Sequence, residues 1–559
     1  MSEEPLSPPK QPPSTQRPSW LQRQWQRLRR QSWRDVVIGE VGPGASNVVI
    51  GKNNIQINVG GRNLTLPVWL MVLALATVAV LLAYPFTEPL LFPSQMTGGI
   101  NIAVTEFGQL DSRARVHTSA LGSALSRTVF DKLEQEYQEN YPNLVGVDGK
   151  SVQIWHDSQG QEVHNVKFGV LAGATPERRT DQAKKLADRI NADIVIYGNL
   201  TQADQVEALQ LEFYYRGDTL RGEPDAITGR HVLGEPVPFP VALKNEPMAV
   251  RELLNEPLGL RSRALFWITV ALIYDVIDQQ DRALTTLQKA EQELAAWDDK
   301  AGQALLHYFI GREAFWLREH ELAIAALNEA KNLNPNYANV YITLGAVYYD
   351  RAQLFYLPQP IPENLAQCVS AEHVDRAAKT ADESMADIDR AIDQLLQAVS
   401  LAPYSPWPPI EALARLQLGH TYRLKGQAYL LAAEHEQSLP WFDKALQEFQ
   451  IAGDAFEQRG DRQYLAWTHL GIGATFQLQA YARLASVTLG DDAASKSAKY
   501  QDSADLFGDA GREYQSCIDE GAEVGDLVWL KKVLDCGCVY YQKIAQDAQA
   551  QVQQLIQEQ

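Results

Sequence analysis

The side chains that most often carry out chemistry are scattered along this chain of 559 residues. Of its ten histidines, His307 and His320 lie in one helical segment, and His420 and His469 lie beside glycines. The sequence motifs of serine hydrolases, zinc peptidases, phosphate-binding loops and kinases are absent. Acidic residues are plentiful, but no carboxylate pair stands out as a general acid and base. We therefore predict no catalytic, cofactor-binding or metal site, and no enzyme activity.

The four cysteines are too few for a disulfide framework. Cys536 and Cys538 form a short pair, but no second pair and no histidine stands at the spacing of zinc ligands. Two interpretations remain open: the cysteines are small buried apolar side chains, or one disulfide joins this pair to Cys517.

One apolar run, residues 66–86, has about twenty residues and no charge. At a rise of ~1.5 Å per residue, a helix of this length spans the ~30 Å hydrocarbon core of a bilayer. Pro67 falls in the first turn, and Trp69 and Tyr84 lie near the two ends, where aromatic side chains favour the headgroup level. The run therefore predicts a single, uncleaved transmembrane helix.

The charge distribution predicts an orientation for that helix. Residues 1–66 hold nine basic and four acidic side chains, although the whole chain carries a net charge of −19. Positive flanks stay on the cytoplasmic side, so we expect a cytoplasmic N-terminus and extracytoplasmic C-terminal domains in the cell membrane. The acidity of the remaining chain argues against a nucleic-acid partner.

The segment before the apolar run has two parts. Residues 1–35 combine a disordered start with a basic amphipathic stretch, in which Trp25 lies beside Arg23, Arg27 and Arg30. This stretch is either a helix on an anionic membrane surface or a solvated basic tail. Residues 36–61 repeat VVIG and alternate in polarity, which predicts a β-hairpin or a short β-solenoid coil. Because so short a piece cannot bury its own apolar face, we expect self-association.

Residues 98–240 alternate strands with helices and predict a small α/β sheet. The opening INIAVTEF, the long amphipathic helix after it and the segment LADRINADIVIYGNL resemble the TolB N-terminal-like and CsgG-like family of bacterial envelope proteins. The resemblance implies a domain that supports interaction and assembly rather than catalysis.

Residues 250–559 are helical throughout, with small residues at repeating positions. The segment 304–336 resembles a tetratricopeptide repeat (TPR), with Gly311 at a close helix approach, Leu327 filling the gap and Pro335 stopping the second helix. The next unit begins 34 residues on, and residues 355–385 are inserted between its two helices. We predict an α-solenoid of five or six helix pairs.

The inner wall of such a solenoid presents side chains of the first helix in each pair, and aromatic and arginine side chains suit peptide binding. The alternative is that these side chains pack against the insertion or the α/β domain. The pattern of lysine and asparagine that some TPR proteins use to bind a C-terminal carboxylate is absent. The residues that the repeat frame places on the inner wall are Tyr308, Arg312, Phe315, Trp316, Asn339, Tyr349 and Asp350.

The predicted fold class is α+β multi-domain and mostly α, with one transmembrane helix, a small α/β sheet domain and a C-terminal TPR solenoid. The predicted function is a membrane-anchored scaffold or sensor of the bacterial envelope that binds protein or peptide partners. One alternative is a membrane signalling or defence component that oligomerises through residues 36–61. The other is an unrecognised hydrolase in the α/β domain.

Overall fold

The computed structural model describes the backbone of residues 36–38, 45–50, 54–59 and 62–67. It also describes residues 95–140, 149–157, 168–217, 227–356, 380–404, 409–524 and 534–558, apart from residues 112, 114, 204 and 489. The chain divides into two compact units, Met1–Phe92 and Pro93–Gln559. The predicted membrane-surface residues Trp25, Arg23, Arg27 and Arg30 lie outside the described residues.

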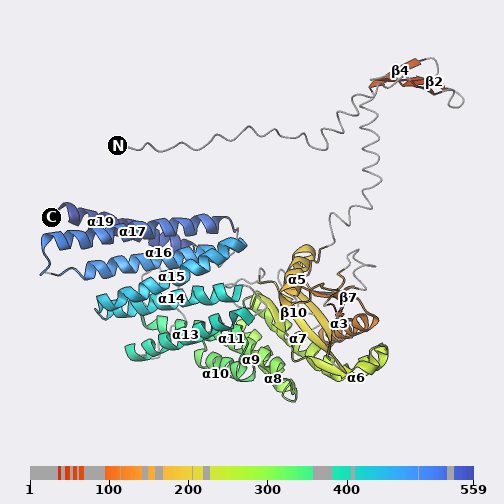
Figure 1. Cartoon of the computed structure of the whole chain (residues 1–559), viewed down its shortest axis with the longest axis horizontal. Helices are drawn as coiled ribbons and strands as arrows, with labels where there is room; N and C mark the ends of the chain where they lie inside the picture. Colours follow the sequence, from red (N-terminus) through yellow and green to blue (C-terminus); the bar gives the residue numbers. More distant parts are fainter. Residues whose placement is uncertain are drawn as a thin grey trace, which may run out of the picture. The chain divides into compact units, whose positions relative to one another are not determined.

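The first unit contains a four-stranded antiparallel sheet in the order β1-β2-β3-β4 (Figure 1). Its strands are β1 (Val36–Ile38), β2 (Ala45–Ile50), β3 (Asn54–Val59) and β4 (Arg62–Pro67). The two VVIG copies pair with each other, with Val36 opposite Ile50 and Ile38 opposite Val48. Of the two predicted arrangements, the backbone pairing is that of a hairpin and not of a solenoid coil.

The structure corrects the predicted transmembrane helix. Leu66 and Pro67, its first two residues, are the end of strand β4 and pair with Ile55 and Asn54 of β3; residues 68–86 lie outside the described residues. Among the helices that are described, not one combines the length and the apolar character that a bilayer crossing requires. The predicted fold class, which included such a helix, and the single-pass localisation that depended on it are therefore wrong. Hydropathy misled the prediction at the start of the run, because the apolar character of a residue does not by itself fix its backbone conformation.

The second unit begins with an eight-stranded mixed sheet (Figure 1). Its main path runs β11-β10-β9-β5-β8, with β12 beside β10 and β6 joining β7 to β9. Strand β5 is parallel to both β8 and β9, whereas β9 and β10 form a long antiparallel pair. The strands are β5 (Ile100–Val104), β6 (Gly108–Leu110), β7 (Val116–His117), β8 (Val152–His156), β9 (Ile194–Ala203), β10 (Val206–Tyr215), β11 (Gly229–Val232) and β12 (Val237–Pro240).

Side chains that alternate along the strands pack against a different helix on each face of this sheet. Ile102 and Ile196 face the core that contains α3 (Ala120–Asn140), whereas Ala103 and Val195 face α5 (Pro176–Ile190). Successive side chains of a strand point to opposite faces. Because both faces of the central strands are buried, the sequences of these strands are continuous apolar runs.

The rest of the second unit is an array of antiparallel helices (Figure 1). Within the described residues, five consecutive pairs pack together: α7 with α8, α9 with α10, α11 with α13, α14 with α15, and α16 with α17. A further helix, α19, packs on α17. The helices are α6 (Pro247–Leu253), α7 (Asn255–Val276), α8 (Gln280–Glu293), α9 (Lys300–Trp316), α10 (His320–Leu333), α11 (Ala338–Tyr356), α13 (Ala381–Leu401), α14 (Pro409–Leu431), α15 (His435–Arg459), α16 (Arg462–Ala485), α17 (Ala493–Ala522) and α19 (Tyr540–Gln557).

Close helix contacts fall where the repeat pattern places them. A Cβ on Gly311 would lie 2.5 Å from Cγ of Leu327, and a Cβ on Gly345 would lie 2.6 Å from Cγ of Leu395. Both distances are shorter than real carbon contacts, so only glycine lets the two helices of each pair approach this closely. The second of these pairs is interrupted by residues 357–380, slightly shorter than the predicted insertion 355–385.

The sheet and the first helix pairs share one hydrophobic core. Ile102, Phe213 and Phe239 of the sheet belong to the same cluster of buried side chains as Trp267 of α7 and Phe309 of α9. His231 of β11 sits in this contact, and its Nδ1 lies 2.9 Å from the hydroxyl of Tyr337. The α/β part therefore covers one end of the helical array.

Candidate functional site

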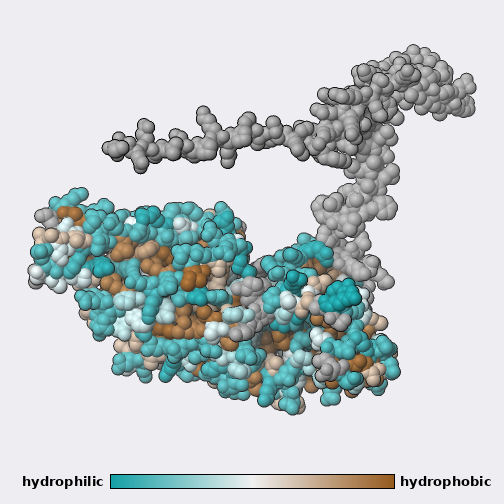
Figure 2. Space-filling model, in the orientation of Figure 1, coloured by the Kyte–Doolittle hydropathy of each residue, from teal (hydrophilic) through white to brown (hydrophobic). Residues whose placement is uncertain are grey.

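A groove with a cavity volume of about 630 Å³ runs along the helical array. Its walls come mainly from α9, α11, α14 and α16, each the first helix of its pair, with contributions from α17 and α19. Figure 2 shows apolar residues gathered over the middle of the helical array, with hydrophilic residues around them. A solenoid presents its first helices on the inner side because the second helices pack outward, which explains why these four helices line the groove.

Aromatic side chains form much of the groove wall. Trp316, Tyr349, Trp467, Tyr481 and Tyr541 come from four different helices and all line the cavity. These side chains are large and keep few rotatable bonds, so they offer contact area at a small entropic cost. Residues far apart in the sequence are thereby brought to one surface.

The imidazole of His420 lies at the base of this wall. It is 6% exposed, and its ring centroid lies 6.4 Å from that of Tyr349, 4.9 Å from Phe449 and 5.7 Å from Trp467. Burial, reinforced by the nearby charge of Arg423, holds the pKa of His420 well below its ordinary value. The imidazole is therefore neutral at pH 7, and its Nε2 has no hydrogen-bond partner in the described part of the chain.

Arg423 lies one helical turn beyond His420 and also lines the groove. Its Nη2 donates a hydrogen bond of 3.3 Å to the Tyr349 hydroxyl, whereas its buried Nε has no partner among the described residues. The other cations of α14 are neutralised: Arg415 pairs with Glu411 and Glu448, and Lys425 pairs with Asp389.

Three half-buried glutamines, Gln353, Gln417 and Gln427, also line the groove. An amide side chain both donates and accepts hydrogen bonds, as the backbone of an extended peptide does. The one groove acid named by the sequence pattern, Asp350, accepts from His320 at 2.8 Å. The groove thus combines apolar walls, amides and an arginine.

The structure brings together some of the predicted groove residues and separates others. Phe315, Trp316 and Tyr349 line the cavity, as does Asp350. Tyr308, Arg312 and Asn339 are buried and are not among the lining residues.

The contacts of two of these buried residues explain why they do not line the groove. The ring of Tyr308 lies 6.4 Å from that of His231 in the adjoining sheet. Arg312 forms ion pairs with Asp275, at 3.0 Å, and with Glu313. At these two positions α9 faces the sheet and α7, whereas its last residues, Phe315 and Trp316, reach the groove.

His420, Arg423 and Trp467 were not among the predicted groove residues. A signal for one of them was present, because Arg423 stands four residues after the repeat glycine Gly419. Phe315 and Tyr349 stand four residues after Gly311 and Gly345 in the same way. Extending that frame by one repeat places Arg423 on the groove.

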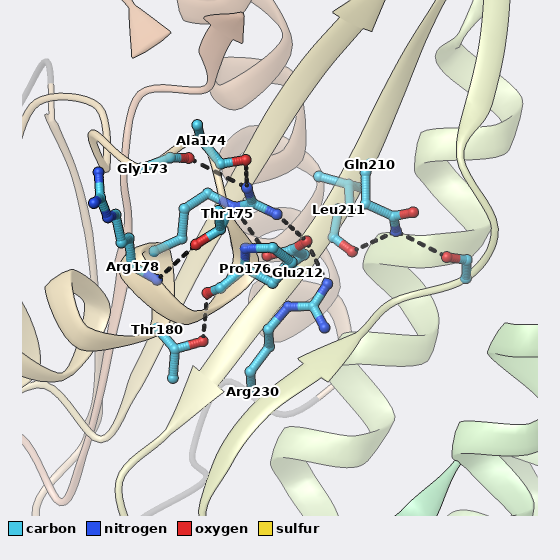
Figure 3. A network of polar contacts seen from close by, with 12 residues as sticks. Gly173, Ala174, Thr175, Pro176, Arg178, Thr180, Gln210, Leu211, Glu212 and Arg230 are labelled. Atoms are coloured by element: carbon cyan, nitrogen blue, oxygen red, sulfur yellow. Dashed lines mark hydrogen bonds and ion pairs between the residues drawn. The ribbon is translucent and has the colours of Figure 1, made fainter. Parts of the chain in front are cut away.

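A second cluster of polar groups lies in the sheet (Figure 3). Glu212 of β10 is fully buried and accepts from Arg230 of β11 at 2.6 Å and from Arg179 of α5 at 2.9 Å. The Arg179 guanidinium also donates to the carbonyl of Gly173, at 3.2 Å. The two arginines hold the pKa of Glu212 below its ordinary value against the opposing effect of burial. Every charge in this cluster faces an internal partner, so we interpret it as a structural connection between α5 and the sheet.

The metal ligands that proteins use do not gather in the described part of the chain. Among these residues, no three histidine, cysteine, aspartate or glutamate side chains are grouped as a metal site would require. Cys517 and Cys538 form a disulfide with a Cα–Cα distance of 6.1 Å, which matches the second of the two interpretations of the cysteines.

The comparisons with known proteins found matches among solved structures. No family model matches the sequence, and no curated protein matches it. Among solved structures, the chain is similar to a thermophilic TPR protein of Thermus thermophilus, with 15% sequence identity and a TM-score of 0.23. The match covers 47% of this chain and 98% of that protein. The predicted resemblance to the TolB N-terminal-like and CsgG-like family finds no support among these comparisons. The described fold itself defines the class: a helical-repeat array that carries a small mixed sheet at one end.

Proposed function

We propose that the groove of the helical array binds an extended segment of a partner protein, so that the chain acts as a protein-interaction scaffold. The observation that carries this proposal is the composition of the groove wall, which contains Trp316, Tyr349 and Trp467 together with amide side chains. Aromatic side chains supply contact energy, and amides suit the donors and acceptors of a peptide backbone.

The proposal is for binding and not for catalysis. His420 is a buried titratable group that lines the groove, and its ring neighbours are Tyr349, Phe449 and Trp467. A general base needs a nucleophile or a substrate proton within hydrogen-bond reach and a pKa near the working pH. The lowered pKa of His420 suits a neutral hydrogen-bonding group instead.

The test is binding of the full-length chain to an array of degenerate nine-residue peptides with blocked ends. Ala346→Arg introduces a long side chain into the groove, whereas Leu396→Arg makes a similar change at a 45% exposed position of α13 that does not line the groove. We expect the first change to weaken binding at least tenfold and the second to leave it unchanged. Equal effects, or no binding by the unaltered chain, would refute the proposed function.

A further inference from the structure

The charge of Arg423 has no counter-ion in the described part of the chain, although the groove is largely apolar. No described carboxylate pairs with this guanidinium, and its Nε is buried without a hydrogen bond. A charged group in a partly desolvated site is costly unless it is paired, and no described side chain offsets this cost for Arg423. An anion placed beside Arg423 would remove it.

A second group beside the arginine points to the same kind of ligand. His420 lines the groove, and its buried Nε2 lacks a hydrogen-bond partner among the described residues. In the Nε2–H tautomer it donates a hydrogen bond. Arg423 and His420 are three residues apart on α14, so their side chains lie on the same helix face and can contact one ligand group.

We infer that the groove selects peptides that carry an acidic side chain flanked by apolar residues, with the carboxylate on Arg423 and His420. This inference rests on the proposed function and specifies the class of partner. Trp467 and Tyr349 flank the two polar groups and supply the surface for the apolar neighbours. The half-buried glutamines along α11 and α14 suit the backbone of a chain that continues past the site in both directions. An internal acidic side chain therefore fits the groove better than a chain terminus.

The binding partner is tested with the full-length chain and the same blocked nine-residue peptides, now with the central position fixed as glutamate, glutamine or lysine. A charge-assisted hydrogen bond discriminates by about 10- to 100-fold, and we expect the glutamate set to bind tighter than the glutamine set by this factor. The lysine set should bind most weakly, because it places a like charge beside Arg423. A fourth set carries glutamine at the centre and a free C-terminal carboxylate.

Variants assign the preference to its residue. Arg423→Gln should abolish the preference for glutamate, and Arg423→Lys should retain part of it. The matched control, Arg415→Gln, removes an arginine from the same helix that is already neutralised and does not line the groove, and should leave the preference intact. Thermal unfolding of each variant reports whether it is folded.

The outcomes separate the inference from the proposed function. Equal binding of the glutamate, glutamine and lysine sets would overturn the inference and leave the scaffold function standing. A preference for the free C-terminal carboxylate over the central glutamate would also overturn it. An absence of binding by every set would refute both.

Discussion

Replacing Glu212 with glutamine should destabilise the sheet strongly, because the carboxylate neutralises two buried arginines. The carboxylate lies 2.9 Å from Arg179 and 2.6 Å from Arg230, and at an effective dielectric constant of about 20 each attraction contributes roughly 6 kcal/mol. Desolvation of the three ions costs several kcal/mol per ion, so the intact cluster is close to neutral in free energy. Removing the anion loses both attractions and leaves both arginine costs, and we expect a loss of about 3–5 kcal/mol.

The assay is native-state hydrogen exchange of the β9–β10 hairpin, which reports the local free energy of opening and does not require the whole chain to unfold in one step. Glu411→Gln is the matched control, because Glu411 pairs with Arg415 at a position that is 48% exposed. That change should cost at most about 1 kcal/mol. The triple variant Arg179→Met, Glu212→Leu and Arg230→Met should recover most of the lost protection.

The same reasoning gives a pH dependence with a definite sign. The pKa of Glu212 is lowered in the folded protein, so its stabilising effect is present above its ordinary pKa and is lost as the pH falls through the folded value. A loss below about 1 kcal/mol for Glu212→Gln, or exchange equal to that of the control, would refute the view that this cluster holds α5 on the sheet.

Three further predictions concern other parts of the chain. Burial lowers the pKa of His231 to about 4. The neutral imidazole therefore stabilises the fold above pH 6.5, and this contribution is lost as the pH falls toward 4. The loss of stability should be roughly 2 kcal/mol between pH 7 and pH 5, and His231→Gln should reduce the slope of the urea midpoint against pH. Gly345→Ala should destabilise the array by about 1–3 kcal/mol, because the new methyl group meets Leu395. Gly511→Ala, whose methyl group meets open space, should stabilise its helix by about 0.5–1 kcal/mol. Equal urea midpoints for the two variants would contradict this expectation. Deletion of residues 36–61 should lower the oligomeric state seen by mass photometry, because β1 and β4 are edge strands that can pair with another copy; an unchanged mass would end the self-association hypothesis.

Much of the helical array could be predicted because its signals are local. Gly311 and Leu327 belong to neighbouring helices joined by a short turn, and their sizes are complementary wherever the pair lies in the chain. The antiparallel pair of β9 and β10 has a local origin too, because alternating polarity and the short turn between the two segments favour such a pair. The apolar run at 66–86 was misjudged because hydropathy reports no backbone conformation, and Leu66 and Pro67 are strand residues.

The sequence by itself determined the repeat architecture, since helix periodicity and small residues at contact positions act between neighbours in the chain. Only the tertiary structure decided which faces of those helices form the groove. Tyr308 and Arg312 occupy frame positions like those of groove residues, but the sheet and Asp275 bury them. His420 and Arg423 meet Tyr349 and Trp467 only after three separate helix pairs stack. Stacking and coverage depend on residues far away in the sequence, so no local pattern contains them.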